Sequence, residues 1–154
     1  MTPIETLAFD HIDLTVNDLT SSIAFYEKVL GALGFRRMPY EEVVVFASAH
    51  TAIGLQPAPE ATRGARFDRY RVGLHHLAFR ARRREDVDAF HTFLAAERIP
   101  ILDPPTEYPQ YGPGYYAVFF ADPDGMKLEL VYWPWGYWKR TMTEGRDERA
   151  RSVP

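Results

Sequence analysis

The chain of 154 residues has no cysteine. Disulfides, thiolate nucleophiles and cysteine-rich zinc sites are therefore excluded. It also lacks an excess of charge of one sign, because 18 Lys and Arg residues face 21 Asp and Glu residues for a net charge of −3. No basic stripe is available for nucleic acid, and no polybasic patch for a membrane surface. We expect neither as a partner.

Long apolar runs are missing as well. No stretch approaches membrane-spanning length, and the first residues lack the basic and apolar regions of a signal peptide. The expected location is the cytoplasm. What the chain does have is 46% hydrophobic and 14% aromatic residues, enough for a packed interior. Its length suits one domain, or two small repeated units that share a core.

Hydrophobic periodicity predicts the same order of elements twice, strand–helix–strand–strand–strand. Shifting the chain by 65 residues places His11 on His76 and Phe25 on Phe90. The predicted strands are 9–16, 35–40, 43–48, 52–57, 72–81, 101–107, 115–121 and 126–133, and the predicted helices follow Asn17-Asp18 and span 83–98. We expect an α+β fold of two βαβββ modules whose sheets form one curved surface around a cavity. The expected parts are a first module (1–58), a linker (59–71), a second module (72–133) and an aromatic, then polar tail (134–154).

Two histidines and one carboxylate occur inside predicted strands: His11, His76 and Glu129. Two imidazoles and a carboxylate can hold a divalent Fe, Mn, Ni or Zn ion and leave positions open for a substrate. The plain alternative is that both histidines are hydrogen-bonded strand residues and that Glu129 faces solvent. A charged side chain buried without a partner would cost stability, so a buried Glu129 would favour the metal.

The chain resembles the vicinal oxygen chelate superfamily, which includes glyoxalase I, bleomycin-resistance proteins and extradiol dioxygenases. The resemblance lies in Asp10-His11-Ile12, in helix residues 22–26, in His75-His76-Leu77-Ala78-Phe79, and in Asp122-Pro123-Asp124-Gly125 four residues before Glu129. It implies paired βαβββ modules and one divalent metal ion (Zn, Ni, Fe or Mn) held by His11, His76 and Glu129.

Two positions qualify this resemblance. His75 competes with His76, but strand alternation predicts that His75 points to the opposite face. The family has a fourth site position, on the last strand of the first module, which carries a carboxylate in many glyoxalase I enzymes. Aligning Leu55-Gln56 with Leu128-Glu129 places Gln56 at this position. Gln56 is thus a weaker candidate ligand that could not act as a general base, which leaves Glu129 as the catalytic residue.

The resemblance implies a glyoxalase-I-like lyase or isomerase acting on a small carbonyl compound or a thiol adduct. One alternative is a protein that binds an antibiotic or metabolite without turnover. Another is an extradiol dioxygenase, although Phe119 stands where that group has a tyrosine.

Several loop residues are candidates for a substrate pocket: Tyr108, Tyr111, Tyr115, Tyr116 and Arg71. As a group they predict an aromatic-lined cavity for a small organic ligand. Residues 133–140 hold all three tryptophans. We expect this segment to cover a sheet edge, cap the pocket or join a homodimer interface.

Overall fold

The computed structural model describes residues 9–134. The tail predicted from the sequence lies outside these residues, apart from Pro134. The described chain divides into two compact units, one made of the residues up to Asp68 together with Asp122–Met126, and the other of Arg69–Ala121 together with the residues from Lys127 on.

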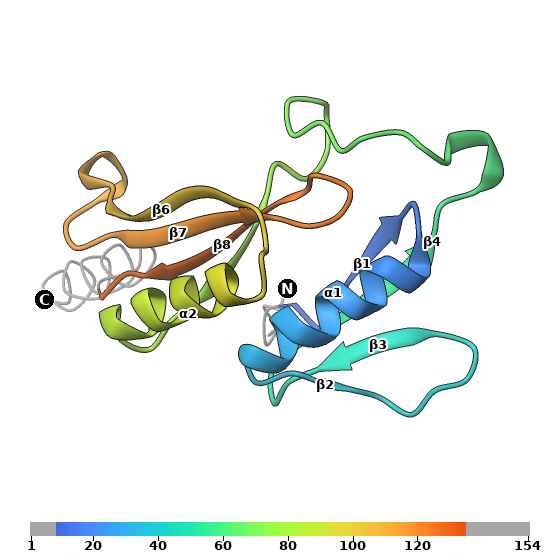
Figure 1. Cartoon of the computed structure of the whole chain (residues 1–154), viewed down its shortest axis with the longest axis horizontal. Coiled ribbons are helices and arrows are strands. Elements are labelled where there is room, and N and C mark those ends of the chain that lie inside the picture. The colour runs from blue at the N-terminus through green and yellow to red at the C-terminus, as the bar shows by residue number, and fades with distance from the viewer. Residues whose placement is uncertain (1–8, 135–154) are drawn as a thin grey trace, which may run out of the picture. The chain divides into compact units, whose positions relative to one another are not determined.

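The first unit contains one βαβββ module (Figure 1). Strand β4 lies between β1, to which it is parallel, and β3, to which it is antiparallel, so the sheet order is β1-β4-β3-β2. A short 3₁₀ turn follows β4 at Glu60–Thr62. The elements are β1 (His11–Val16), α1 (Leu19–Ala32), β2 (Arg36–Arg37), β3 (Val44–Ala47) and β4 (Ala52–Pro57).

Helix α1 covers one face of this sheet. It begins after Asp18, whose side chain accepts a hydrogen bond from the backbone N–H of Ser21 at 2.6 Å. It ends at Ala32, and Gly34 just beyond it has a φ of 87°, a conformation that favours glycine. Tyr26 and Leu30 on the helix are fully buried. The side chains of β1 alternate between the sheet face buried under the helix and the exposed face.

The second unit repeats the module (Figure 1). Its sheet order is β5-β8-β7-β6, with β5 parallel to β8 and the remaining pairs antiparallel. Its 3₁₀ turn lies at Pro109–Tyr111. The elements are β5 (Leu77–Arg80), α2 (Arg84–Ala96), β6 (Ile101–Glu107), β7 (Tyr116–Ala121) and β8 (Lys127–Tyr132).

The core of the second unit lies between α2 and one face of this sheet. Val87, Phe90 and Leu94 of the helix are buried, and the Phe90 ring packs edge-to-face on Phe120 of β7 at 5.4 Å. Leu128 of β8 belongs to the same face of the sheet as Phe120, with which it pairs. Because side chains alternate along β8, residue 129 must point to the face that α2 does not cover.

The turn between β7 and β8, Asp122–Met126, groups with the first unit although its flanking strands belong to the second. The hydroxyl of Tyr26 donates to Asp122 at 2.9 Å in a buried hydrogen bond. The side-chain amide and the backbone N–H of Asn17 donate to the two oxygens of Asp124 at 2.8 and 2.9 Å. Helix α1 and the end of β1 therefore hold this turn.

The predicted α+β fold of two βαβββ modules is confirmed, and each module forms a four-stranded mixed sheet of its own. Strands 52–57 and 101–107 have the predicted bounds. The first strand of the second module is shorter than predicted, because Gly73 has a φ of 143° and Val72 and Leu74 are exposed. Within residues 9–134, no helix combines the length and apolar character needed to cross a membrane.

Candidate functional site

The two modules can be compared residue by residue. Helices α1 and α2 begin at Leu19 and Arg84, 65 residues apart, which is the spacing between His11 and His76. Strands β4 and β8 each contain six residues and pair with the first strand of their module in parallel. This correspondence identifies which side chains of the two modules occupy equivalent places.

Glu129 is the third residue of β8 and pairs with Ala78 of β5 and Phe119 of β7. Its side chain has no exposed surface, and it lies on the sheet face opposite α2. Burial raises the pKa of Glu129, while a hydrogen bond from the Tyr115 hydroxyl and the charge of Lys127 oppose that rise. The Tyr115 hydroxyl donates to Oε1 of Glu129. The sequence left open whether Glu129 is buried, and the structure shows that it is.

His76 lies immediately before β5, on the same sheet face as Glu129. Its Nε2 is 3.0 Å from Oε2 of Glu129. The two atoms are close enough for an ion pair, yet the contact lacks hydrogen-bond geometry, and no other donor in residues 9–134 hydrogen-bonds to Oε2. Burial lowers the pKa of His76, and the charges of Lys127 and Arg69 lower it further. The neutral imidazole, which is the form that binds metals, is therefore favoured.

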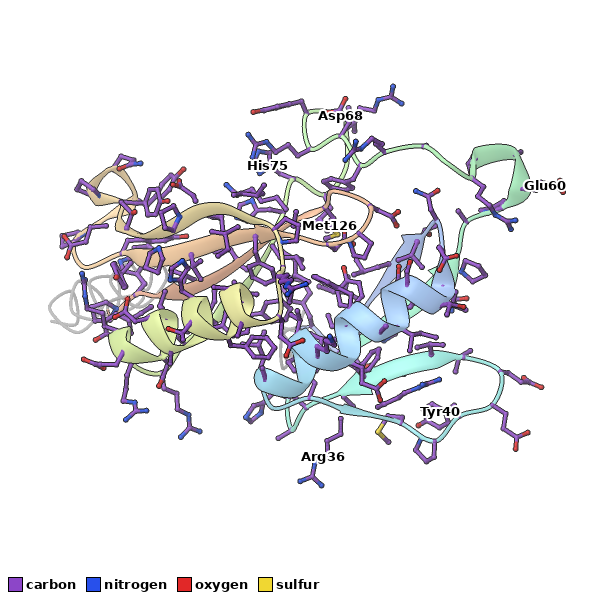
Figure 2. The ribbon with its side chains drawn as sticks, in the orientation of Figure 1. Arg36, Tyr40, Glu60, Asp68, His75 and Met126 are labelled. Carbon is purple, nitrogen blue, oxygen red and sulfur yellow. The ribbon has the colours of Figure 1, made fainter. Side chains whose placement is uncertain are left out.

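His75 does not point to the opposite face, so that prediction is wrong. Its Nδ1 lies 2.7 Å from Nδ1 of His76, and the two rings meet edge-to-face at 5.0 Å. The alternation rule does not apply because β5 begins only at Leu77. Figure 2 labels His75 on the segment that leads into β5. When His76 donates from Nδ1, its Nε2 carries a lone pair towards Glu129.

His11 has a similar neighbour in the first module. Its Nδ1 lies 2.9 Å from Oδ2 of Asp10, the residue that corresponds to His75 under the 65-residue shift. The hydrogen bond to Asp10, followed by the negative charge of Asp13, raises the pKa of His11. In both modules, the residue before the histidine thus engages Nδ1 and leaves Nε2 available as a ligand atom.

The chemistry of His76 and Glu129 fits a divalent metal ion. Nitrogen and oxygen ligands lie about 2.0–2.2 Å from such an ion, so two neighbouring ligands of an octahedral site are about 3 Å apart. The observed separation of Nε2 and Oε2 is 3.0 Å. Two ligands alone do not complete a site, and within residues 9–134 no group of three His, Cys, Asp or Glu side chains gathers. The role of His11 as a third ligand stays a prediction.

Three of the predicted pocket tyrosines pack together, and one of them, Tyr115, hydrogen-bonds Glu129. The Tyr111 ring packs on Tyr108 at 5.9 Å and on Tyr115 at 5.1 Å. Tyr108 also packs edge-to-face on Phe119 at 5.3 Å, and Tyr115 contacts Trp133 at the same distance. These five residues are called the aromatic cluster below: Tyr108, Tyr111, Tyr115, Phe119 and Trp133.

The other two predicted pocket residues lie elsewhere in the second unit. The Tyr116 hydroxyl donates to Asp88 of α2 at 2.6 Å, and the Arg84 guanidinium lies 3.6 Å from the centre of the Tyr116 ring. Tyr116 is therefore on the helix side of the sheet, as its alternation with Tyr115 requires. Arg71 lies exposed in the segment before β5.

The alignment of Gln56 with Glu129 is wrong in its register. Glu129 pairs with Ala78, which stands two residues after His76. The equivalent of Ala78 in the first module is residue 13, two residues after His11, and it pairs with Gly54. Gly54 is also the third residue of β4, as Glu129 is of β8. Gln56 pairs with Thr15 and is exposed, two residues further along the same face as Gly54.

Lys127 is a neighbour of the site that the sequence analysis missed. Its ammonium lies 3.5 Å from the centre of the Phe119 ring, a cation–π contact. Burial, together with the charge of Arg69, lowers the pKa of Lys127. Strand alternation would have found it, because Lys127 stands two residues before Glu129 and so shares its face.

Two βαβββ modules, each with a helix over one face of a mixed sheet, define a class of α+β proteins. The chain belongs to the Glyoxalase/Bleomycin resistance protein/Dioxygenase superfamily, whose sequence profile matches residues 8–130. This confirms the resemblance seen in its motifs.

Individual relatives agree with this family. The chain is 34% identical over 122 residues to the uncharacterized protein YqjT of Bacillus subtilis, covering 79% of this chain and 95% of the relative. A candidate glyoxalase from Bacillus halodurans is 32% identical with a TM-score of 0.69, over 81% of this chain and 95% of that one. A lactoylglutathione lyase from Agrobacterium tumefaciens, 22% identical, shares the fold with a TM-score of 0.61 over 89% of this chain and all of the other.

Proposed function

We propose that this protein is a metal-dependent enzyme, a glyoxalase-I-like lyase or isomerase that acts on a small carbonyl compound or a thiol adduct. The observation that carries the proposal is the fully buried Glu129 carboxylate, whose Oε2 lies 3.0 Å from Nε2 of His76. A carboxylate excluded from water needs a compensating positive charge, and a divalent cation would supply it.

The proposed ligands are His76 and Glu129, joined by His11 on the basis of the sequence. A divalent ion held by them would polarise neighbouring oxygens of a carbonyl substrate and acidify the adjacent C–H bond. Zn, Ni, Fe and Mn all accept this combination of imidazole and carboxylate ligands.

Glu129 is the proposed proton acceptor. Its pKa is raised by burial, so its carboxylate is a stronger base than one in water. Tyr115 is a positioning residue, because its hydroxyl holds Oε1 and so orients the carboxylate. The aromatic cluster borders the same carboxylate and would exclude water from a bound substrate.

The aromatic cluster also supports a second function, the binding of a small organic molecule without turnover. Stacked and edge-to-face rings suit a flat or apolar ligand, whether or not it reacts. A pure binder gives no reason for the buried Glu129 beside His76, which is why the enzyme is preferred. A ring-cleaving dioxygenase ranks lower because Phe119 has no hydroxyl to move a proton.

The decisive experiment is metal analysis of the full chain purified without chelators, followed by assays with 2-oxoaldehydes in the presence and absence of thiols. We expect one divalent ion per site and conversion that is lost in His76→Ala but kept in the control His50→Ala, since His50 is an exposed loop residue. Metal-free protein that binds small aromatic ligands equally well with and without His76 would overturn the enzyme in favour of the binder. The homodimer expected from the sequence stays a prediction for light scattering to test.

A further inference from the structure

Lys127 presents a positive charge on the sheet face that carries Glu129. It is the first residue of β8 and stands two residues before Glu129, so both side chains leave the strand on the face that α2 does not cover. At the usual rise per residue of a strand, the two Cα atoms lie roughly 7 Å apart. A group bound by Lys127 would therefore belong to the same small molecule as a carbon that reacts at Glu129.

The Lys127 ammonium has a neutral partner in the structure. It lies 3.5 Å from the centre of the Phe119 ring, in a cation–π contact. The ring attracts the charge but offers no oxygen to the N–H donors of the ammonium. Within residues 9–134, Lys127 forms no hydrogen bond and no ion pair, so its donors are available to a ligand.

Two carboxylates act on Lys127 through their charge, and other side chains already engage both. The Tyr115 hydroxyl donates to Oε1 of Glu129. The Tyr108 hydroxyl donates to Oδ2 of Asp103 at 2.5 Å. These hydroxyls hold the carboxylates away from the ammonium, which leaves its charge without a salt bridge from either of them.

Arg69 adds a second positive charge to this part of the second unit. Its charge lowers the pKa of both His76 and Lys127, which places it close to these side chains. Its contacts in the described part of the chain are with the neutral Tyr70, whose hydroxyl accepts a hydrogen bond at 2.7 Å and whose ring centre is 4.8 Å away. Like charges repel each other, so an anion bound by both cations would relieve a cost that the protein bears without it.

The surroundings of Lys127 favour an anion of low charge. Glu129 and Asp103 act on the same side chain, so they would repel a doubly charged phosphate more strongly than a carboxylate. The aromatic cluster, which includes Phe119, adds an apolar surface next to the ammonium. A small molecule with one carboxylate and an apolar body matches both features.

We propose that Lys127 binds a carboxylate of the substrate, with Arg69 as a second and weaker contact. The carboxylate belongs either to the carbonyl compound itself or to the thiol part of an adduct. This inference rests on the proposed function, because that function places the reacting carbon beside Glu129. The ammonium donates charge-assisted hydrogen bonds to the carboxylate and so orients the substrate towards Glu129.

The test is calorimetric titration of the full chain with phenylglyoxylate and with its neutral amide, both with and without Ni²⁺. The two probes share a ring and a 2-oxo group and differ in charge. Lys127→Met removes the ammonium and keeps a flexible stem against Phe119. We expect the affinity for phenylglyoxylate to fall by about 10- to 100-fold, as for loss of a hydrogen bond to a charged group, and the affinity for the amide to stay unchanged.

Three further variants complete the test. Lys127→Arg keeps the charge and should keep most of the preference for the acid over the amide. Arg69→Gln should cause a smaller loss than Lys127→Met, because Tyr70 already holds its guanidinium. Lys28→Met, at an exposed position of α1, is the matched control and should bind both probes as the wild type does.

Titration with glutathione alone distinguishes the two sources of the carboxylate. Loss of phenylglyoxylate binding in Lys127→Met assigns the carboxylate to the carbonyl compound, and loss of glutathione binding assigns it to the thiol. If the wild type binds neither acid, or binds both as Lys127→Met does, the carboxylate site is refuted while metal uptake still supports the proposed function. An equal loss for the acid and the amide also refutes it. Binding that depends on Lys127 in a chain that takes up no metal keeps the carboxylate site and refutes the metal-dependent enzyme.

Discussion

The two modules share their backbone plan and differ in how they surround their histidine. Each has a helix that begins three or four residues after the end of its first strand, and a last strand of six residues that is parallel to the first. Glu129 is buried on the last strand of the second module, whereas Asp13 is exposed on the first strand of the first. The repeat thus preserves the positions available to a site, while the residue type at each position varies.

The residues in contact with the two histidines differ in charge as well. His11 is held by the Asp10 carboxylate, and its pKa is raised; His76 lies beside His75 and near Lys127, and its pKa is lowered by burial and by positive charge. A neutral imidazole can bind a metal directly, whereas a protonated imidazole must first lose its proton. His76 is therefore in the neutral, metal-binding form down to a lower pH than His11.

The largest effect is expected for Glu129→Gln, which removes the charge of the buried carboxylate and keeps its shape. Metal affinity should fall by more than about 100-fold, beyond the range for residues that only support a ligand. The melting temperature of the metal-free protein should not fall, because burying a neutral amide costs less than burying a charge. Titration calorimetry and thermal denaturation would check both. A clear drop in melting temperature with unchanged metal binding would mean that Glu129 serves the fold and not the site.

Changing the residue that contacts Nδ1 of each histidine should cause a smaller loss of metal affinity. Because each module has one such residue, these two variants compare the modules directly. His75→Ala and Asp10→Ala should each weaken binding by about 10- to 100-fold, because the orientation of the ligand ring is lost while the ring itself remains. The loss for Asp10→Ala should be the larger one, since a carboxylate also makes the imidazole a stronger donor. Calorimetry on the two variants would sharpen the comparison, and equal affinity to the wild type in both would remove the proposed role of these neighbours.

The smallest effect is expected for Tyr26→Phe, and it concerns the fold alone. The lost hydrogen bond to the buried Asp122 should cost about 1–3 kcal/mol of unfolding free energy at neutral pH, with no change in metal affinity. Burial raises the pKa of Asp122, and the Tyr26 hydroxyl, by stabilising the carboxylate, opposes that rise.

The pH dependence of this effect has a defined sign. Because the folded pKa of Asp122 is raised, the stability linked to its protonated form is complete below the unfolded pKa and is lost as the pH rises through the folded one. Without Tyr26 that loss becomes larger, so the variant should suffer more at neutral pH than under acidic conditions. Urea unfolding at both pH values would measure it, with the exposed Tyr40→Phe as control. An equal cost at both pH values would contradict this account.

Local patterns were sufficient to predict the α+β fold and the order of elements. Alternation and helical spacing identify each strand and helix, and the Asp-Pro-Asp-Gly turn separates the last two strands. They failed at Val72–His76, where apolar residues alternate as in a strand although Gly73 has a φ of 143° and Val72 is fully exposed. A hydrophobic pattern shows what a strand would bury, and it does not show whether a partner strand is present.

The site was less accessible to sequence reasoning, because it depends on strand register. Leu55-Gln56 resembles Leu128-Glu129 as a pair of letters, but the pairing of β1 with β4 makes Gly54 the counterpart of Glu129. Register is a property of two segments far apart in the chain, so one segment alone cannot reveal it. The placement of Tyr116 against α2, with Tyr115 beside Glu129, likewise depends on the pairing of β7 with β8.

The turn Asp122–Met126 has a consequence for how such a protein can be divided. The chain leaves the second unit at this turn, is held by Tyr26 and Asn17 of the first, and then returns to form β8. A gene cut between the modules would separate the buried Tyr26 hydroxyl from its acceptor and Asn17 from Asp124. Each half would then be missing hydrogen-bond partners, so recombination between relatives should succeed when this turn and α1 are inherited together.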